Sequence, residues 1–153
     1  MPSRRQTMTA GLASLAMLGG GVLAAPAFAA AARPTVVVEQ TLLKALPGKA
    51  DALGQYLAAN WLVMDQQALD QGLFTGFWLA RSASGFEEWD YAMSVGYPTA
   101  FGYDDPATSA GFEAIRAAHA VALIDGEGLA RLGRIVSSQR LDVVAVRGFA
   151  AAV

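Results

Sequence analysis

The residues with the greatest capacity for chemistry are a single histidine and a single asparagine. His119 is the only histidine and Asn60 the only asparagine among the 153 residues. An imidazole can bind a metal ion or transfer a proton near neutral pH, and an amide both donates and accepts hydrogen bonds. Because one imidazole without a partner motif seldom forms a metal site, we interpret His119 first as a hydrogen-bonded residue of the core or of a pocket edge.

Aromatic residues lie where they could share a surface with Asn60. Tyr56, Asn60 and Trp61 fall within about one and a half turns of a predicted helix, so they lie on or beside one helix face. Tryptophan and tyrosine stripes of this kind also fit a core or a dimer-facing sheet surface, and that alternative stays open. The candidate ligand-binding residues are Tyr56, Asn60, Trp61, Trp78, Tyr91 and His119.

Several other chemistries are excluded or disfavoured. The chain has no cysteine, which rules out thiolate metal sites and cysteine nucleophiles. Ser94 lies two residues before Gly96, as in a nucleophile elbow, but an elbow requires a strand-to-helix turn and here Pro98 follows without an immediate helix. Zinc sites need three or four ligands at recognisable spacings, and none is visible. We therefore assign no catalytic residue and expect no metal.

The first 29 residues have the order of parts typical of a cleaved export signal. Arg4 and Arg5 precede an apolar run at residues 10–25, and Ala27-Phe28-Ala29 follows, with small side chains at positions 27 and 29. Three consecutive glycines interrupt the run, which argues against a membrane-spanning helix. The paired arginines resemble a twin-arginine signal and also fit a general secretory one. We expect cleavage after Ala29 and a periplasmic or secreted protein.

The chain that remains after cleavage has the size of a single domain. It would be 124 residues long, with nine basic and thirteen acidic side chains and a formal charge near −4. Nucleic acids and anionic membranes both require a concentrated basic surface, so neither is an expected partner. We expect a linker at 30–34, one domain at 35–147 and a C-terminal tail at 148–153.

One long helix is predicted over residues 49–71. Apolar residues recur there every three or four positions, which places them on one helix face: Leu53, Leu57, Trp61, Met64 and Ala68. Gly72 follows, and glycine commonly ends a helix. We expect this face to pack against a sheet, with Trp61 in the core.

Four segments have the composition of β-strands. Residues 35–44 are rich in β-branched and apolar side chains, residues 73–81 and 88–97 form a predicted hairpin, and residues 141–146 form a last apolar run. In the second hairpin strand large and small side chains alternate. The large side chains are Trp89, Tyr91, Met93, Val95 and Tyr97. One face of this strand is therefore bulky and the other is small.

Two more helices complete the predicted order. Asp105 followed by Pro106 is typical of a helix start, and residues 126–135 suggest a short helix before the last strand. The elements then follow the order β-α-β-β-α-β, which is that of a ferredoxin-like α+β fold. This fold predicts a four-stranded antiparallel sheet with helices on one face.

Residues 35–146 resemble the dimeric α/β-barrel superfamily, and most of all its NIPSNAP-like and antibiotic-biosynthesis-monooxygenase-like branches. The resemblance is based on Pro47-Gly48-Lys49 after the opening strand, Trp61 within the long helix, Gly72 before Trp78, and the aromatic strand that ends at residues 95–98. It implies a homodimer formed through the sheets and a pocket between sheet and helices. The fold hosts several chemistries and does not choose among them.

The resemblance leaves two functions from different classes open. The first is a non-catalytic periplasmic dimer that binds a small apolar or aromatic molecule without a cofactor. The second is an enzyme that uses the same pocket. It would be either a cofactor-independent monooxygenase, for which the superfamily uses asparagine, tryptophan and tyrosine, or a haem protein in which His119 resembles an axial ligand by its location. A buried polar group beside Asn60 and Tyr56 would favour the oxygenase.

Overall fold

A computed structural model describes residues 33–84 and 88–144. In these residues, four strands form one antiparallel sheet: β1 (Val37–Ala45), β2 (Gly76–Arg81), β3 (Tyr91–Tyr97) and β4 (Gly133–Asp142). The order across the sheet is β2-β3-β1-β4. The predicted export signal at residues 1–29 and the tail at 148–153 lie outside the described residues.

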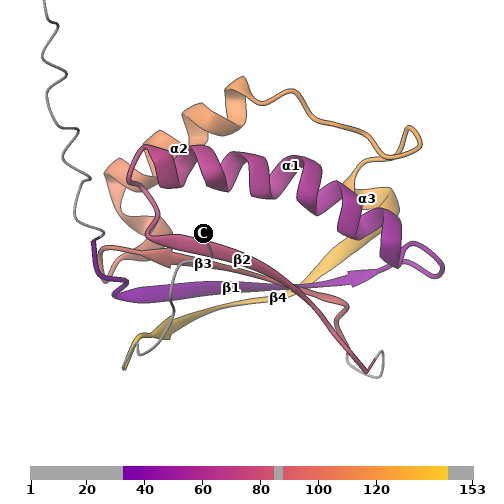
Figure 1. The fold of residues 1–153 in the computed structure, drawn as a ribbon, viewed down its shortest axis with the longest axis horizontal. Helices are drawn as coiled ribbons and strands as arrows, with labels where there is room; N and C mark the ends of the chain where they lie inside the picture. Colours follow the sequence, from indigo (N-terminus) through magenta and orange to yellow (C-terminus); the bar gives the residue numbers. More distant parts are fainter. Residues whose placement is uncertain (1–32, 85–87, 145–153) are drawn as a thin grey trace, which may run out of the picture. The chain divides into compact units, whose positions relative to one another are not determined.

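The helices connect the strands in the predicted order. They are α1 (Ala50–Asp70), the short 3₁₀ helix η1 (Gly102–Asp104), α2 (Pro106–Ala118) and α3 (Leu129–Leu132). Figure 1 shows α1 and α2 side by side on the same face of the sheet. The prediction of a ferredoxin-like α+β fold, with helices on one face of a four-stranded antiparallel sheet, is therefore confirmed.

The alternation of large and small side chains on β3 decides which face the helices cover. Tyr91, Met93 and Tyr97 are buried and belong to the two hydrophobic clusters of the core. Side chains alternate between the faces of a strand, so Ala92 and Ser94 face the opposite side of the sheet. The bulky face predicted from the sequence is thus the face beneath the helices.

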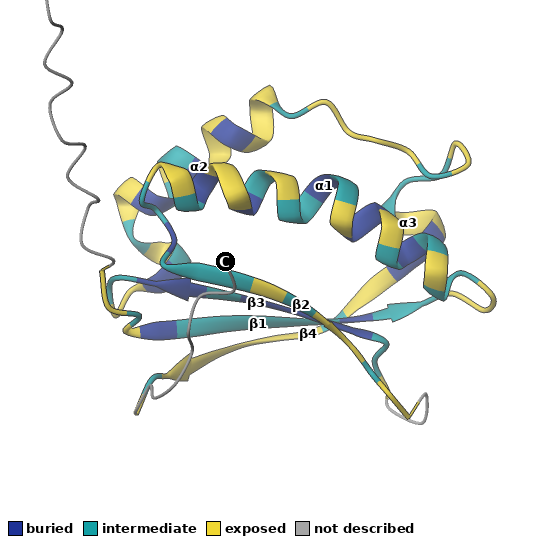
Figure 2. Ribbon diagram, in the orientation of Figure 1, coloured by how far each residue is buried: buried dark blue, intermediate teal, exposed yellow. Residues whose placement is uncertain are grey.

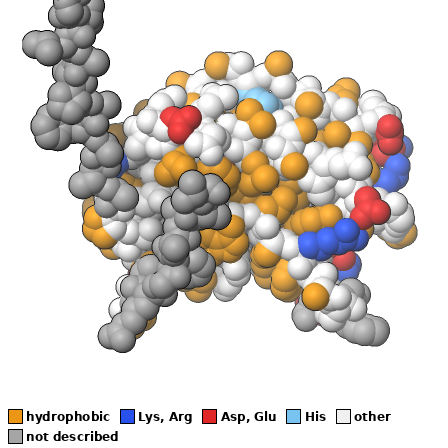
Figure 3. Space-filling model, viewed as in Figure 1, with side chains coloured by type: hydrophobic (Ala, Val, Ile, Leu, Met, Phe, Trp, Pro, Cys, Tyr) orange, Lys and Arg blue, Asp and Glu red, His pale blue; other side chains and the backbone are white. Residues whose placement is uncertain are grey.

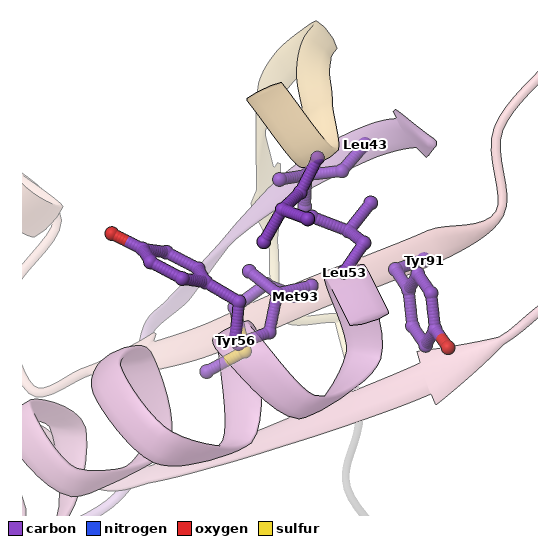
Figure 4. Close-up of a cluster of buried hydrophobic side chains, with 7 residues drawn as sticks. Leu43, Leu53, Tyr56, Tyr91 and Met93 are labelled. Atoms are coloured by element: carbon purple, nitrogen blue, oxygen red, sulfur yellow. The ribbon is translucent and has the colours of Figure 1, made fainter. Parts of the chain in front are cut away.

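The first cluster lies between the beginning of α1 and the middle of the sheet. Leu53 of α1 packs with Leu43 of β1 and Met93 of β3, and all three are almost fully buried. Figure 4 shows Tyr56 and Tyr91 on opposite sides of this cluster, with their hydroxyl groups pointing away from each other. The two tyrosines therefore belong to different surroundings, although both contribute to the same cluster.

Local signals in the sequence set the helix ends. The Asp105 side chain accepts a hydrogen bond from the Thr108 amide at 3.0 Å, and Pro106 is the first residue of α2, as predicted. At the end of α1, Gly72 has a φ of 71°, a left-handed conformation that glycine adopts without strain. The predicted ends of the long helix are correct to within one residue.

The predictions for the hairpin strand and for the last helix and strand are partly wrong. β3 begins at Tyr91, three residues later than predicted. α3 has only the four residues Leu129–Leu132, and β4 follows at once, ahead of the predicted run at 141–146. Within the described residues, β4 is an edge strand that pairs with β1 alone, and most of its side chains are exposed (Figure 2). An exposed edge strand does not need apolar residues, so hydrophobicity did not reveal it.

On one face of the molecule, charged side chains gather toward one end. Figure 3 shows hydrophobic side chains over the middle of the visible face, whereas most charged ones lie at the end where α1 begins. The ion pairs Lys49–Glu127 at 2.7 Å and Arg81–Asp51 at 2.9 Å are formed there. Among the described residues, we find no helix that is both long and apolar enough to cross a membrane.

Candidate functional site

A cavity of about 480 Å³ lies between the sheet and the two longer helices. Side chains of β1 and β3 form one wall, and side chains of α1, α2 and the segment after α2 form the other. Arg116 and Val121 line the cavity and are also exposed, so they mark its rim. The volume is within the range of about 300–1,000 Å³ that is typical of small-molecule sites.

The side chain of Asn60 forms the hydrogen bonds that connect helix α1 with the segment after α2. Its side chain is buried, with 1% exposed. The Nδ2 group donates to the carbonyl oxygens of Tyr56 and Ala122, each at 2.9 Å. Oδ1 accepts from the Ala122 amide at 2.8 Å and bonds to Nε2 of His119 at 3.0 Å. The amide thus uses its full hydrogen-bonding capacity within the protein and has none left for a ligand.

His119 lies at the cavity edge, where α2 ends. Its backbone is extended, with φ −75° and ψ 125°, because the helix stops at Ala118. Both amide hydrogens of Asn60 are directed to carbonyl oxygens, so the atom that faces the imidazole is an acceptor. Nε2 of His119 must therefore carry the proton and donate it. His119 is a hydrogen-bonded pocket-edge residue, which is the interpretation that the sequence favoured.

Asp65 is a buried carboxylate in the wall of the cavity. It belongs to α1, is only 5% exposed, and forms no hydrogen bond or ion pair with any described residue. Burial raises the pKa of this carboxyl group from 3.8 to about 7, because the charged form loses contact with water. Asp65 therefore changes its protonation state near neutral pH.

Glu39, the other carboxylate in the cavity wall, has a very different environment. Arg140 donates to Glu39 Oε1 from both Nε, at 3.0 Å, and Nη2, at 2.8 Å. The same oxygen accepts from the backbone amide of Tyr103 at 3.2 Å. The charge of Glu39 is thus balanced by a guanidinium group and a backbone dipole, whereas the charge of Asp65 is not.

Aromatic rings surround the part of the cavity near these carboxylates. Phe74 contacts Tyr97 edge to face, with ring centroids 5.1 Å apart, and lies 5.2 Å from Phe112. Burial, followed by the charges of Glu39 and Asp65, raises the pKa of Tyr97 above its usual range. The Tyr97 hydroxyl therefore stays protonated and can act as a hydrogen-bond donor at every physiological pH.

Four of the six candidate ligand-binding residues line the cavity. Tyr56, Asn60, Trp61 and His119 come together there from α1 and from the end of α2. The expectation that Trp61 belongs to the core is only partly correct. Its ring packs against the first cluster but stays half-buried, because its other side borders the cavity.

The other two candidates, Trp78 and Tyr91, lie away from the cavity, and their assignment to the site is corrected here. Trp78 is paired with Ser94 on the face of the sheet opposite the helices and is 50% exposed. Tyr91 is the first residue of β3. Its side chain lies beside the beginning of α1, where its hydroxyl donates to the Ala50 carbonyl at 3.1 Å. Side chains alternate along a strand, so Trp78 lies on the face of the sheet that does not border the cavity. Tyr91 lies beyond the cavity because it stands at the far end of β3.

Sequence analysis missed Asp65, Glu39 and Arg116. Asp65 is four residues after Trp61, so it lies on the buried side of the predicted helix. Only apolar positions define the predicted buried face, so an aspartate on that face is not counted. A polar residue at helical spacing from the apolar ones is the signal that indicates it. No metal site emerges: in residues 33–84 and 88–144, no group of three or more histidine, aspartate or glutamate side chains could hold an ion.

Comparison with known proteins identifies the fold. No protein-family model and no curated protein matches the sequence. The haem degrader MhuD from Mycobacterium tuberculosis, solved with two haems in its active site, matches with a TM-score of 0.50 and 18% identity over 73% of this chain and 99% of that one. The fold is ferredoxin-like. HapK from Hahella chejuensis matches at a TM-score of 0.47 and 14% identity, over 76% of this chain and 99% of HapK.

This fold is the one implied by the resemblance to antibiotic-biosynthesis-monooxygenase-like proteins. The likeness does not distinguish the NIPSNAP-like branch, which stays a prediction. At 18% identity the likeness to MhuD establishes architecture alone, so the function has to be argued from the cavity.

The raised pKa of Asp65 predicts a pH-dependent loss of stability. The folded protein holds this proton up to about pH 7, whereas the unfolded chain releases it near 3.8. The free energy of unfolding should therefore fall between these pH values, by an amount on the order of 2–4 kcal/mol, and level off above them. Urea denaturation of wild-type protein and Asp65→Asn at about pH 5 and pH 8 measures this, and the variant should lose less stability.

Asp70→Asn is the matched control. Asp70 is also on α1, but it is exposed and accepts a hydrogen bond from Gln66 at 2.8 Å. This variant should keep the wild-type pH profile. Equal pH dependence in wild-type protein and Asp65→Asn would contradict the raised pKa.

Proposed function

We propose that this protein is exported and binds a small apolar or aromatic molecule in the cavity between the sheet and the helices. The observation that carries the proposal is the cavity itself, about 480 Å³ in volume, with aromatic rings and a few polar groups in its walls. Sites for small organic ligands have this composition. Export is proposed from residues 1–29 alone.

The polar groups of the cavity limit what the ligand can be. Asn60 is fully hydrogen-bonded within the protein, and Glu39 is paired with Arg140. A ligand with many polar groups would therefore find few partners, which supports a mainly apolar molecule. Cofactor-independent oxygenation is the second candidate function. It is favoured by Asp65, a buried polar group in the same cavity as Asn60 and Tyr56.

Removal of the cavity-lining tryptophan should weaken binding of an apolar aromatic probe. We expect 1-methoxynaphthalene to bind saturably to the wild-type protein, and Trp61→Ala to bind it about three- to tenfold more weakly because a ring contact is lost. Titration calorimetry measures both affinities. The matched control is Trp78→Ala, which removes a tryptophan from the other face of the sheet and should leave the affinity unchanged. Absence of saturable binding by the wild-type protein would contradict the proposal.

The residues as placed do not fit haem. Haem iron takes an axial nitrogen with a lone pair. Nε2 of His119 donates its proton to Asn60, which leaves Nδ1 as the only ring nitrogen with a lone pair. Haem propionates are anionic and are stabilised by neighbouring cations, but Arg116 at the rim is already paired with Glu113, and Asp65 and Glu39 place two carboxyl groups in the walls. We therefore propose that the ligand is not haem and that the protein works without a cofactor.

The absorption spectrum of added haem tests this point. We expect wild-type protein and His119→Ala to give the same Soret band when equimolar haem is added, because His119 does not ligate iron. A Soret shift seen with wild-type protein and lost in His119→Ala would contradict the proposal and promote the haem alternative.

We further propose that two copies of the chain form a homodimer through the open face of the sheet. Trp78 of β2 is 50% exposed and Leu141 of β4 is 42% exposed. Leu141 is paired with Val38 of β1 on this face. Ser94, Gln40 and Gln139 form a hydrogen-bonded row across it. Exposed apolar surface on a sheet commonly marks a partner surface.

Analytical sedimentation tests the dimer. The mature chain should sediment as a dimer at micromolar concentration, and Trp78→Glu should shift it toward the monomer, because a charge would be buried without a partner. The matched control is Val63→Glu, which places the same charge on the exposed side of α1 and should leave the dimer intact. A wild-type monomer under these conditions would contradict the proposal.

A further inference from the structure

The unexplained feature of the cavity is the isolation of Asp65. A carboxylate that is 5% exposed normally has hydrogen bonds or a cation beside it, because burial of an unpaired charge is costly. Asp65 has neither among the described residues, although it lines a cavity that can hold a ligand. The other cavity carboxylate, Glu39, is fully compensated by Arg140 and by the Tyr103 amide. Among the parts of the molecule that the structure describes, only the cavity leaves room for a partner of Asp65.

We propose that Asp65 selects hydroxyaromatic ligands, accepting a hydrogen bond from the ligand hydroxyl while the ring lies among the aromatic side chains of the cavity. This inference rests on the proposed function, since it concerns the same cavity. The inference adds the chemical class and the orientation of the ligand. It also names Asp65 as the residue that distinguishes a hydroxyaromatic ligand from an unsubstituted aromatic one.

The walls around Asp65 supply contacts for a flat ring. Phe74, Tyr97 and Phe112 form a chain of ring contacts, and all three line the cavity with Asp65. Tyr103 continues the chain, with its ring centroid 6.0 Å from that of Phe112. Aromatic rings prefer edge-to-face or offset contacts with one another. A planar ligand can therefore be held by ring contacts on its body and by one hydrogen bond at its hydroxyl.

A neutral hydroxyl suits the ligand group that donates to Asp65 better than an ammonium group does. An organic cation would lose its own hydration on entering the cavity, and the attraction of one buried carboxylate often fails to offset that cost. A hydroxyl loses far less hydration and still forms a charge-assisted hydrogen bond with the ionised carboxylate. Because burial raises the pKa of Asp65 to about 7, such a donor would also stabilise the ionised form and lower that pKa on binding.

A matched pair of probes tests the proposal. 1-Naphthol and 1-methoxynaphthalene share the ring system, but only the first has a hydroxyl hydrogen. At about pH 8, where Asp65 is ionised, the wild-type protein should bind 1-naphthol about tenfold or more tighter than the methyl ether, as expected for a hydrogen bond to a charged group. In Asp65→Asn this preference should fall to a few-fold, whereas Asp70→Asn should retain the wild-type preference.

Proton release supplies a second measurement that does not depend on a variant. Titration of the wild-type protein with 1-naphthol near pH 6.5, in two buffers of different ionisation enthalpy, should show release of a fraction of a proton, because the ligand favours ionised Asp65. The methyl ether should release none. At about pH 5, where Asp65 is protonated, the preference for 1-naphthol should be smaller than at pH 8.

The outcomes separate this inference from the proposed function. If both probes bind wild-type protein equally well, the role of Asp65 is overturned while the apolar cavity stands. If neither probe binds, both are overturned. If 1-naphthylmethylamine binds tighter than 1-naphthol and loses that advantage in Asp65→Asn, the cavity selects an organic cation and the inference is wrong.

Discussion

The cavity depends on the four hydrogen bonds of one buried amide. Asn60 joins α1 to the backbone of Ala122 through both its nitrogen and its oxygen, and it fixes the imidazole of His119 through the same oxygen. The segment after α2 has no regular secondary structure up to the isolated bridge at Ile124, so these bonds hold it where it closes one side of the cavity. Without them the buried amide would be left unsatisfied, which is costly in a core.

The two carboxylates in the cavity wall show how environment, and not residue type, sets chemical character. Glu39 lies on β1 opposite Arg140 of β4, and the strand register brings the guanidinium to it. Asp65 comes from the second half of α1, where burial alone shifts its pKa and no described residue forms an ion pair with it. The first is therefore a structural ion pair, whereas the second keeps a pKa near neutrality and an open hydrogen-bonding capacity inside an aromatic cavity.

Most of the fold could be predicted from the sequence because its helices and strands are set by interactions between residues close together in the chain. The 3.6-residue period of α1, the Asp105 cap, Gly72 and the alternation on β3 each report a constraint satisfied within a few residues. β4 was misplaced because its partner β1 lies about a hundred residues earlier in the chain. An edge strand can be polar and still form a full row of backbone hydrogen bonds, so side-chain hydrophobicity does not reveal it.

The sequence by itself determined the order of elements, the bulky face of β3 and the gathering of Tyr56, Asn60 and Trp61 on one helix, because these follow from backbone periodicity. Only the tertiary structure decided that the hydrogen bonds of Asn60 go to Ala122 and His119 and that Trp78 faces away from the helices. It also decided that Asp65 lines the cavity without a hydrogen-bond partner among the described residues. The physical reason is that hydrogen-bond satisfaction and desolvation depend on every group within a few ångströms, including groups sixty residues away in the chain.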